Sequence, residues 1–443
     1  MDRSKCSAQM IAELGISSID NLFEDIPQEV RIPGLKLPAG MSELELIREM
    51  ERVLSANQPA SRWLSFLGAG VYHHFIPAAV KTVISRSEFI TSYTPYQPEI
   101  SQGMLQAQFE YQSFMTELTS VDYMNCSVYD VSTAIGEAIL MSHRIARGKR
   151  FLMSRSVSPE RKEVARLYAK GADIEIVEVA YAPETGQVDI SDLESKMSGD
   201  VIGFYFETPN FFGPLETGWK GIRDVLGEKT MVVGINPLAL ALVKPPGEMG
   251  ADIVVGDAQV FGVPMSYGGP SIGIFGCKAD HVRKMPGRLI GMTEDAEGRR
   301  SFCMTLQTRE QHIRRSKATS NICTNEALLA VAVATHLAVL GRTGLRRIAL
   351  RNLENMRSLS KRIDAVDGFD APVFDAPHFN EFAVRSDVPA ESIRKNLLDK
   401  RIHGGVSLDR WFPELKDCAL YATTEMHSQT DHDRLLTALE GVR

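Results

Sequence analysis

Between about residues 150 and 276, short apolar runs alternate with longer amphipathic stretches, and this alternation restricts the fold more than any other feature of the chain. The short runs have the length and composition of buried strands, and they lie at residues 151–154, 174–179, 201–206, 231–235, 252–255 and 271–275. Ser158 followed by Pro159 predicts the start of a helix that ends before Gly171. Further helices are expected after Asp189 and Thr217. Strands and helices that alternate at this spacing predict right-handed crossovers and a mainly parallel sheet with helices on both faces.

The segments on either side of this region differ from it, and they predict three domains in all. Residues 1–60 are expected to form an N-terminal helical arm, in which Ser42 caps a helix that extends to Leu54. Such an arm either clasps a second subunit or covers the main domain, and the sequence leaves both options open. Residues 61–340 then form a large domain, and residues 341–443 a small C-terminal domain of helices and strands.

The C-terminal part of the chain has its own predicted elements. A long helix is expected from near Asn325 past Leu340 to a break at Gly341 and Gly344, and helical spacing then recurs from Leu345 to Ile363. Strands follow at 381–384 and 418–423, and a last helix is expected from about Thr430, where Thr430 and Asp433 resemble a capping box. A large sheet domain, a long connecting helix and a small domain together are typical of several α/β enzyme folds, so the architecture alone does not identify a function.

Composition excludes several classes of function. The chain has 443 residues, 44% of them hydrophobic, which is enough to bury a large core. The net charge of -7 does not favour nucleic acid or an anionic membrane as a partner. The six cysteines form no CxxC pair and no zinc-finger spacing with histidine, so no metal site is expected. The polar first residues and the lack of an 18-residue apolar run indicate a soluble protein of a reducing compartment, which is the cytoplasm or, after processing, a matrix-like equivalent.

Long motifs carry a specific family resemblance. Residues 68–77 have the sequence GAGVYHHFIP, and residues 85–103 have the sequence SRSEFITSYTPYQPEISQG. Together with FEYQ at 109–112, VVGDAQVFGVP at 254–264, GGP at 268–270 and REQHIRRSKATSNICT at 309–324, they resemble the P proteins of the glycine cleavage system. The resemblance spans most of residues 60–345. It implies a fold-type I, pyridoxal phosphate (PLP)-dependent transferase-like architecture: an α/β large domain with a mainly parallel sheet, and a small C-terminal α+β domain.

The resemblance also implies a reaction and its partners. P proteins decarboxylate glycine with PLP, release CO2 and transfer the aminomethyl group to the lipoyl arm of the H protein. PLP serves as the electron sink in such reactions. The chain has about half the length of single-chain P proteins, which fits the α subunit of the two-subunit form. Its expected partners are therefore a β subunit, the lipoylated H protein and glycine, with PLP held by the β subunit.

Three positions imply that this chain lacks a cofactor site of its own. When Pro264 and residues 268–270 are aligned with the family pattern, Gln259 lies at the position of the Schiff-base lysine, and an amide cannot form an imine. Val131 replaces a glycine where a phosphate cup is expected. Asn236 stands where an aspartate would hold the pyridine nitrogen. The chain is therefore expected to provide no catalytic residue and to bind no PLP covalently.

The loop from Tyr93 to Glu99 is the candidate substrate pocket or interface of this chain. Two prolines restrict its backbone, so it forms neither a regular strand nor a helix, and it carries several hydrogen-bonding side chains. Its candidate site residues are Tyr93, Thr94, Tyr96, Gln97 and Glu99. The loop either faces an active site shared with the β subunit or the H-protein channel, or it only shapes the subunit interface.

Other residues have weaker functional interpretations. Lys278, Lys284 and Lys317 are alternative Schiff-base candidates, but surface or ion-pairing roles are commoner for lysine. His73 and His74 are adjacent, so their side chains point in different directions and do not form a metal-binding pair. Arg309, Arg314 and Arg315 could bind an anion or form structural ion pairs. Cys126 and Cys323 resemble small buried residues more than nucleophiles. No GxGxxG motif follows a strand, so NAD binding is not expected.

Two alternative functions stay open at this point. The chain could be an independent PLP-dependent decarboxylase or aminotransferase that uses one of these lysines. It could also be a non-catalytic structural subunit.

Overall fold

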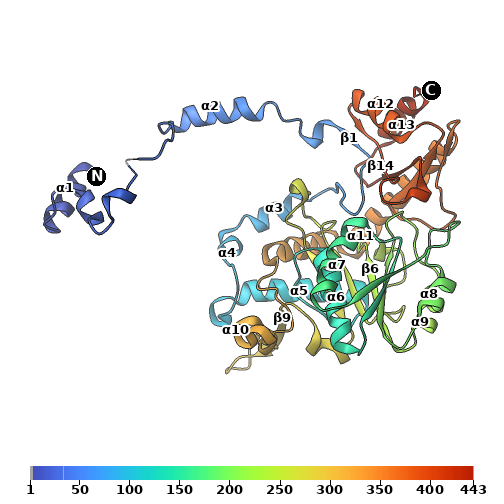
Figure 1. Cartoon of the computed structure of the whole chain (residues 1–443), viewed down its shortest axis with the longest axis horizontal. Coiled ribbons are helices and arrows are strands. Elements are labelled where there is room, and N and C mark those ends of the chain that lie inside the picture. Colours follow the sequence, from blue (N-terminus) through green and yellow to red (C-terminus); the bar gives the residue numbers. More distant parts are fainter. Residues whose placement is uncertain (1–2, 33, 443) are drawn as a thin grey trace. The chain divides into compact units, whose positions relative to one another are not determined.

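The computed structural model describes residues 3–32 and 34–442, and it divides the chain into two compact units, Met1–Pro59 and Ala60–Arg443 (Figure 1). The first unit contains helices α1 (Arg3–Glu13) and α2 (Glu43–Leu54). Ser42 caps α2 as predicted, because its hydroxyl accepts from the Glu45 N–H while the Glu45 carboxylate accepts from the Ser42 N–H at 2.8 Å. The backbone N–H groups of Ser42 and Glu45, which have no partner within the helix, are thereby hydrogen-bonded at the start of α2.

A seven-stranded sheet forms the centre of the second unit. Its strands are, in spatial order, β2 (Tyr123–Met124), β8 (Gly273–Cys277), β7 (Ile253–Asp257), β6 (Thr230–Ile235), β5 (Val201–Thr208), β3 (Arg150–Ser154) and β4 (Glu175–Val179). The five strands from β7 to β4 are parallel to one another, whereas β8 and β2 are antiparallel to their neighbours. The six predicted strands are confirmed. The sequence did not predict β2, because a strand of two residues is too short to show an alternation of apolar and polar residues. The predicted mainly parallel sheet is also confirmed.

Helices cover both faces of this sheet, because successive apolar side chains of a strand point to opposite faces. On β6, Met231 and Val233 pack into the cluster that includes residues of α5 (Gln102–Thr119) and α11 (Ala327–Asp364), whereas Val232 packs into the cluster of α6 (Val131–Ile145) and α7 (Pro159–Gly171). The shorter helices α8 (Ile190–Lys196) and α9 (Trp219–Leu226) contribute Leu193 and Ile222 to the α5 and α11 side. The helices predicted after Ser158, Asp189 and Thr217 are thus all present.

The 38-residue helix α11 links the sheet to the C-terminal elements, and it is kinked at Gly341, which has φ 58°. The predicted break at Gly341 is confirmed, because the backbone there is not helical and a kink separates the two helical stretches on either side. Among the described residues, α11 alone is long and apolar enough to cross a membrane. However, Ala330, Val333 and Leu337 lie in the main core, so its apolar part packs against protein.

The C-terminal part forms a small antiparallel sheet covered by helices. Its sheet contains, in spatial order, β11 (Phe369–Asp370), β12 (Glu381–Ser386), β15 (Cys418–Ala422) and β14 (Val406–Ser407), and its helices are α12 (Ala390–Asp399) and α13 (Gln429–Glu440). Both predicted strands are confirmed. The last helix begins one residue earlier than predicted, because Ser428 and Asp431 form the capping box instead of Thr430 and Asp433. The division into a large and a small domain near residue 340 stays a prediction.

The remaining elements connect these parts. They are β1 (Leu64–Ser65) and β13 (Ile402–His403), which pair with each other, the antiparallel hairpin of β9 (Leu289–Glu294) and β10 (Arg300–Thr305), and the short helices α3 (Ala78–Ile84), α4 (Ser87–Ile90) and α10 (Gln311–Arg314). In the resulting arrangement, the carboxyl ends of β5, β6 and β7 meet the start of β12. Ligands of open α/β sheets bind at the carboxyl ends of the strands, so this edge is the place to look for a site.

Candidate functional site

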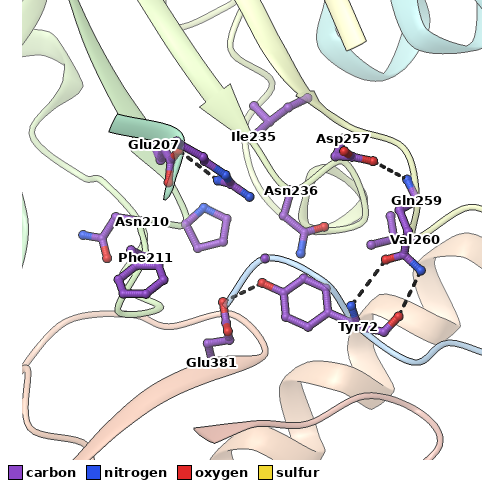
Figure 2. Close-up of a pocket in the computed structure, with 13 residues that line it drawn as sticks. Tyr72, Glu207, Asn210, Phe211, Ile235, Asn236, Asp257, Gln259, Val260 and Glu381 are labelled. Carbon is purple, nitrogen blue, oxygen red and sulfur yellow. Dashed lines mark hydrogen bonds and ion pairs between the residues drawn. The ribbon is translucent and has the colours of Figure 1, made fainter. Parts of the chain in front are cut away.

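A narrow polar pocket lies at the carboxyl ends of β5, β6 and β7 (Figure 2). Glu207 comes from the end of β5, Asn236 follows β6, and Asp257 and Gln259 come from the end of β7 and the turn after it. Glu381 closes the pocket from β12. The full set of lining residues is Gly70, Tyr72, Arg161, Glu207, Pro209, Asn210, Phe211, Ile235, Asn236, Asp257, Gln259, Val260 and Glu381. The structure thus brings Gln259 and Asn236 together in one pocket, whereas their assignment to a former cofactor site stays a prediction.

Gln259 uses its side-chain amide to hold the segment around Tyr72. Its Nε2 donates to the Tyr72 carbonyl at 3.0 Å and to the Val263 carbonyl at 2.9 Å, while its Oε1 accepts from the Tyr72 N–H at 3.3 Å. The side chain is buried. Because each polar atom of this amide already has a protein partner, Gln259 acts here as a clamp between the end of β7 and residues 68–77.

Glu381 holds the same segment from the opposite side. Its carboxylate accepts from the Ala69 N–H at 2.6 Å and from the Tyr72 hydroxyl at 2.5 Å. A Cβ at Gly68 would lie 2.3 Å from this carboxylate, so only glycine permits the close approach. Burial raises the pKa of Glu381 to about 7, although the hydrogen bonds from Tyr72 and Ala69 act in the opposite direction. This carboxyl is therefore expected to change its charge near neutral pH.

An ion pair occupies the β5 side of the pocket. The Arg161 guanidinium, from α7, donates to Glu207 Oε1 at 2.9 Å, and the Tyr205 hydroxyl donates to the same oxygen at 2.8 Å. Burial alone would lower the pKa of Arg161, but the neighbouring Glu207 raises it above its ordinary value. Arg161 is consequently charged, and the side chains of Arg161 and Glu207 take up space that a ligand would need.

Asp257 meets the first turn of α6 at the remaining side of the pocket. Its carboxylate accepts from the Ser271 hydroxyl at 2.5 Å, the Gln259 N–H at 2.9 Å and the Val131 N–H at 3.4 Å. Asp130 caps the same helix, since its carboxylate accepts from the Thr133 N–H at 2.7 Å. Burial raises the pKa of Asp257. Two amides of the first turn of α6, those of Val131 and Thr133, are thus already bound to carboxylates and are not free for a phosphate.

The predicted loop residues lie away from this pocket. None of Tyr93, Thr94, Tyr96, Gln97 and Glu99 is among the described residues that line it. Tyr93 and Tyr96 are exposed, at 75% and 43%. The Tyr96 hydroxyl instead receives a hydrogen bond from Arg288 Nη2 at 3.2 Å. Both tyrosines of the loop are therefore exposed, and the role of the loop stays a prediction.

The other candidate residues have the following places. Lys278 pairs with Asp252 at 2.6 Å, beyond the amino end of β7, and no lysine is among the described residues that line the pocket. His73 is exposed, whereas His74 is buried and its Nδ1 lies 2.8 Å from Glu425. Burial alone would raise the pKa of Glu425, but hydrogen bonds from His74, the Phe75 N–H and Asn352 lower it to about 2.

The remaining candidates are structural or exposed. Arg309 donates to the carbonyls of Met285 and Gly287, while Arg314 and Arg315 are exposed. Cys126 is buried, and burial raises its pKa to about 12, which removes nucleophilic character at neutral pH. Cys323 is exposed, contrary to the expectation that it would be a small buried residue.

Sequence reasoning missed most of the polar residues in the pocket. Tyr72, Arg161, Glu207, Asp257 and Glu381 come from five separate segments, so no local spacing connects them. A signal was present at two of them. Glu207 and Asp257 are acids at the carboxyl ends of otherwise apolar strands, where side chains of parallel sheets converge.

Comparisons with known proteins agree on one family. The family model described as "Glycine cleavage system P-protein" matches residues 2–439. Curated proteins named probable glycine dehydrogenase (decarboxylating) subunit 1 are similar over nearly the whole chain. The protein from Pyrococcus horikoshii is 50% identical over 98% of this chain and 97% of its own length, and the protein from Anoxybacillus flavithermus is 47% identical over 97% and 96%.

Solved structures agree in fold. A crystal structure of glycine decarboxylase (P-protein) of the glycine cleavage system, in inhibitor-bound form, matches with a TM-score of 0.89 and 38% identity, over 98% of this chain and 97% of that chain. A glutamate decarboxylase from Lactobacillus brevis matches over 94% and 96%, with a TM-score of 0.67 and 11% identity, which supports the fold alone. The predicted fold-type I architecture is thereby confirmed.

Proposed function

Because the chain belongs to the glycine cleavage system P-protein family, we propose that it works as subunit 1 of a two-subunit glycine dehydrogenase (decarboxylating). The full-length match to subunit 1 proteins carries this conclusion, and it implies a second subunit as partner. In the assembled enzyme, PLP would supply the electron sink for removal of the glycine carboxylate. The aminomethyl group would then pass to the lipoyl arm of the H protein, as the family resemblance implies.

The second subunit is the proposed holder of PLP, since the polar pocket of this chain does not fit the cofactor. The pocket leaves a free volume of about 40 Å³, room for a few water molecules but not for a pyridine ring with its phosphate. Gln259 offers no amine, and its amide is already hydrogen-bonded on both sides. Asp257 holds the Val131 amide where a phosphate would bind. These contacts support an active site that this chain helps to build without carrying the cofactor.

The loop from Tyr93 to Glu99 is the proposed contribution of this chain to that shared site. Its tyrosines are exposed and therefore accessible. The Arg288 guanidinium donates a hydrogen bond to the Tyr96 hydroxyl and lies against its ring, and these contacts hold the Tyr96 side chain in place. Side chains held in this way can orient a substrate that another subunit binds. Glycine and the lipoylated H protein are the proposed reactants, and the cytoplasm is the proposed location.

Reconstitution tests the assignment. This chain, the second subunit and their mixture would each be assayed with PLP and H protein for exchange of the glycine carboxyl with bicarbonate. We expect exchange in the mixture and none with this chain alone. Exchange by this chain alone would favour an independent PLP enzyme. Equal exchange by the second subunit alone and by the mixture would favour a structural role.

The loop is tested in the same assay. Tyr96→Phe and Glu99→Gln are expected to lower turnover without weakening the complex, because they remove polar contacts and little apolar area. Tyr123→Phe is a matched control, since Tyr123 is 45% exposed and lies outside the loop. Unchanged turnover in both loop variants, within a complete complex, would show that the loop only shapes the interface.

A further inference from the structure

The outer face of α11, beyond its kink at Gly341, carries a dense stripe of positive charge. Residues 342–362 contain seven of the 49 Lys and Arg residues of the chain but only one of its 56 Asp and Glu residues. Six of the seven are exposed, and we call these six the basic stripe: Arg342, Arg346, Arg347, Arg351, Arg357 and Lys361. The chain as a whole has a net charge of -7, so this local excess runs against its overall composition.

Helix geometry places the basic stripe opposite the packed face of α11. The buried apolar residues of this part of the helix are Leu345, Ala349, Met356, Leu359 and Ile363. At about 100° per residue, they occupy one side of the helix, and the six bases spread over about half of its circumference on the other side. Because the apolar positions fix the rotation of the helix, the stripe is presented to solvent.

The charge of the basic stripe is largely unpaired. None of its six side chains forms an ion pair within the described part of the chain, whereas Arg362 at its border pairs with Asp433. Arg346 donates to the Ala241 carbonyl at 3.3 Å, which is a neutral acceptor. Like charges four residues apart on a helix repel each other, and the stripe contains such pairs. An anionic partner at this face would therefore relieve repulsion as well as gain attraction.

An apolar groove adjoins the basic stripe at the kink. It has about 670 Å³ of free space, and Arg342 and Arg346 of the stripe line it. Its apolar lining includes Phe114, Leu118, Leu240, Leu337 and Leu345, and its carboxylates are Glu117 and Glu248. The free space lies in the range of about 300–1,000 Å³ that is typical of ligand pockets, so the groove can admit an apolar side chain of another protein. Charge and an apolar anchor point are thus combined on one face.

These features fit a partner that binds and leaves better than a permanent subunit. Charged residues are depleted at the centre of protein interfaces, whereas complementary charges around the contact speed up association. We propose that the basic stripe and its groove form a docking surface for an acidic protein that binds transiently. The identity of this protein rests on the proposed function, in which the lipoylated H protein takes up the aminomethyl group and then leaves. Nucleic acid is disfavoured by the net negative charge of the chain.

Binding of lipoylated H protein to the assembled two-subunit enzyme tests this surface. The test variant combines Arg347→Glu with Arg357→Glu, because glutamate has nearly the helix propensity of arginine. The control variant combines Arg147→Glu with Arg410→Glu, which makes the same change in net charge at exposed arginines outside α11. At about 0.1 M salt, charges more than about 10 Å apart are largely screened. Fluorescence anisotropy is therefore expected to show about tenfold weaker binding in the test variant and wild-type binding in the control.

Salt and steady-state kinetics give two further measurements of the same surface. Added salt should weaken H-protein binding more in the wild type than in the test variant, since the variant has lost the screened attraction. In the exchange assay, the KM for H protein should rise about tenfold in the test variant while kcat stays unchanged, because docking precedes the chemistry. An unchanged kcat would also show that the test variant is folded and assembled.

Two results would overturn the docking surface. One is equal H-protein binding by the wild type, the test variant and the control, or an equal loss in both variants. The other is tighter binding of a random-sequence DNA duplex than of H protein through the stripe, which would assign the surface to nucleic acid. Exchange with an unchanged KM in the test variant would count against the docking surface alone. Charge-dependent H-protein binding without exchange would count against the proposed function alone.

Discussion

Glu381 should make the stability of this chain depend on pH near neutrality. Its carboxyl is buried, and its pKa is raised from 4.5 to about 7 by burial. The folded state therefore holds the proton more tightly than the unfolded state does. The resulting stabilisation is fully present below pH 4.5 and is lost as the pH rises through 7. Since one pKa unit corresponds to about 1.4 kcal/mol, the free energy of unfolding should fall by about 3 kcal/mol over this range from Glu381 alone.

Glu381→Gln removes this titration while it keeps a group of similar shape. The amide oxygen can still accept from the Ala69 N–H, and the amide nitrogen can donate to the Tyr72 hydroxyl. The wild-type chain is therefore expected to lose about 3 kcal/mol more than the variant between about pH 5 and about pH 8.

Denaturant unfolding of the isolated chain, followed by circular dichroism at several pH values, measures this difference. Glu391→Gln is the control, because Glu391 is an exposed glutamate bound to Arg394 at 2.7 Å on the protein surface. The control should leave the slope between these pH values unchanged. If the unfolding free energies of the wild type and Glu381→Gln run parallel from acid to alkaline pH, the buried-carboxyl reasoning is wrong.

Three further predictions concern the same segment and pocket. The pKa of Glu425 is lowered from 4.5 to about 2, so its contribution to the free energy of unfolding, up to about 3 kcal/mol, is present above pH 4.5 and is lost as the pH falls through 2. In Glu425→Gln, the free energy of unfolding should therefore fall less over this acid range. An unchanged dependence of unfolding on acid pH would contradict the assignment. Gln259→Leu should destabilise the chain by about 2–4 kcal/mol, because it leaves polar backbone groups of Tyr72 and Val263 unpaired; denaturant unfolding within about 0.5 kcal/mol of wild type would refute this. Gln259→Lys should still bind no PLP covalently, since Asp257 and Asp130 occupy amides at the start of α6. A pyridoxyl-modified peptide at position 259, detected by mass spectrometry after borohydride reduction, would overturn this prediction.

Local patterns predicted most of the fold because the signals were themselves local. Each of the six sheet strands expected between residues 150 and 276 is an apolar run bounded by helix-start or turn residues, and each lies within two residues of its predicted place. The N-cap at Ser42 likewise depends on residues three apart. The antiparallel β8 is different, since strand direction depends on how the connection after Gln259 returns through residues 260–272. Sequence spacing alone did not distinguish it from a parallel neighbour.

The sequence by itself determined the family and the mainly parallel sheet, because long motifs and short apolar runs are readable in one dimension. Only the tertiary structure decided which groups Gln259 binds and what surrounds it. Tyr72, Glu207 and Glu381 lie far apart in the chain, and the hydrogen bonds and ion pair that close the pocket depend on side chains brought together from separate elements. The same is true of Arg288 and Tyr96, which are far apart in the chain and form a hydrogen bond only in the folded structure. Burial and contacts between distant segments produce no periodic pattern in a sequence. They nevertheless determine the charges of the side chains in a site and the space that is left between them.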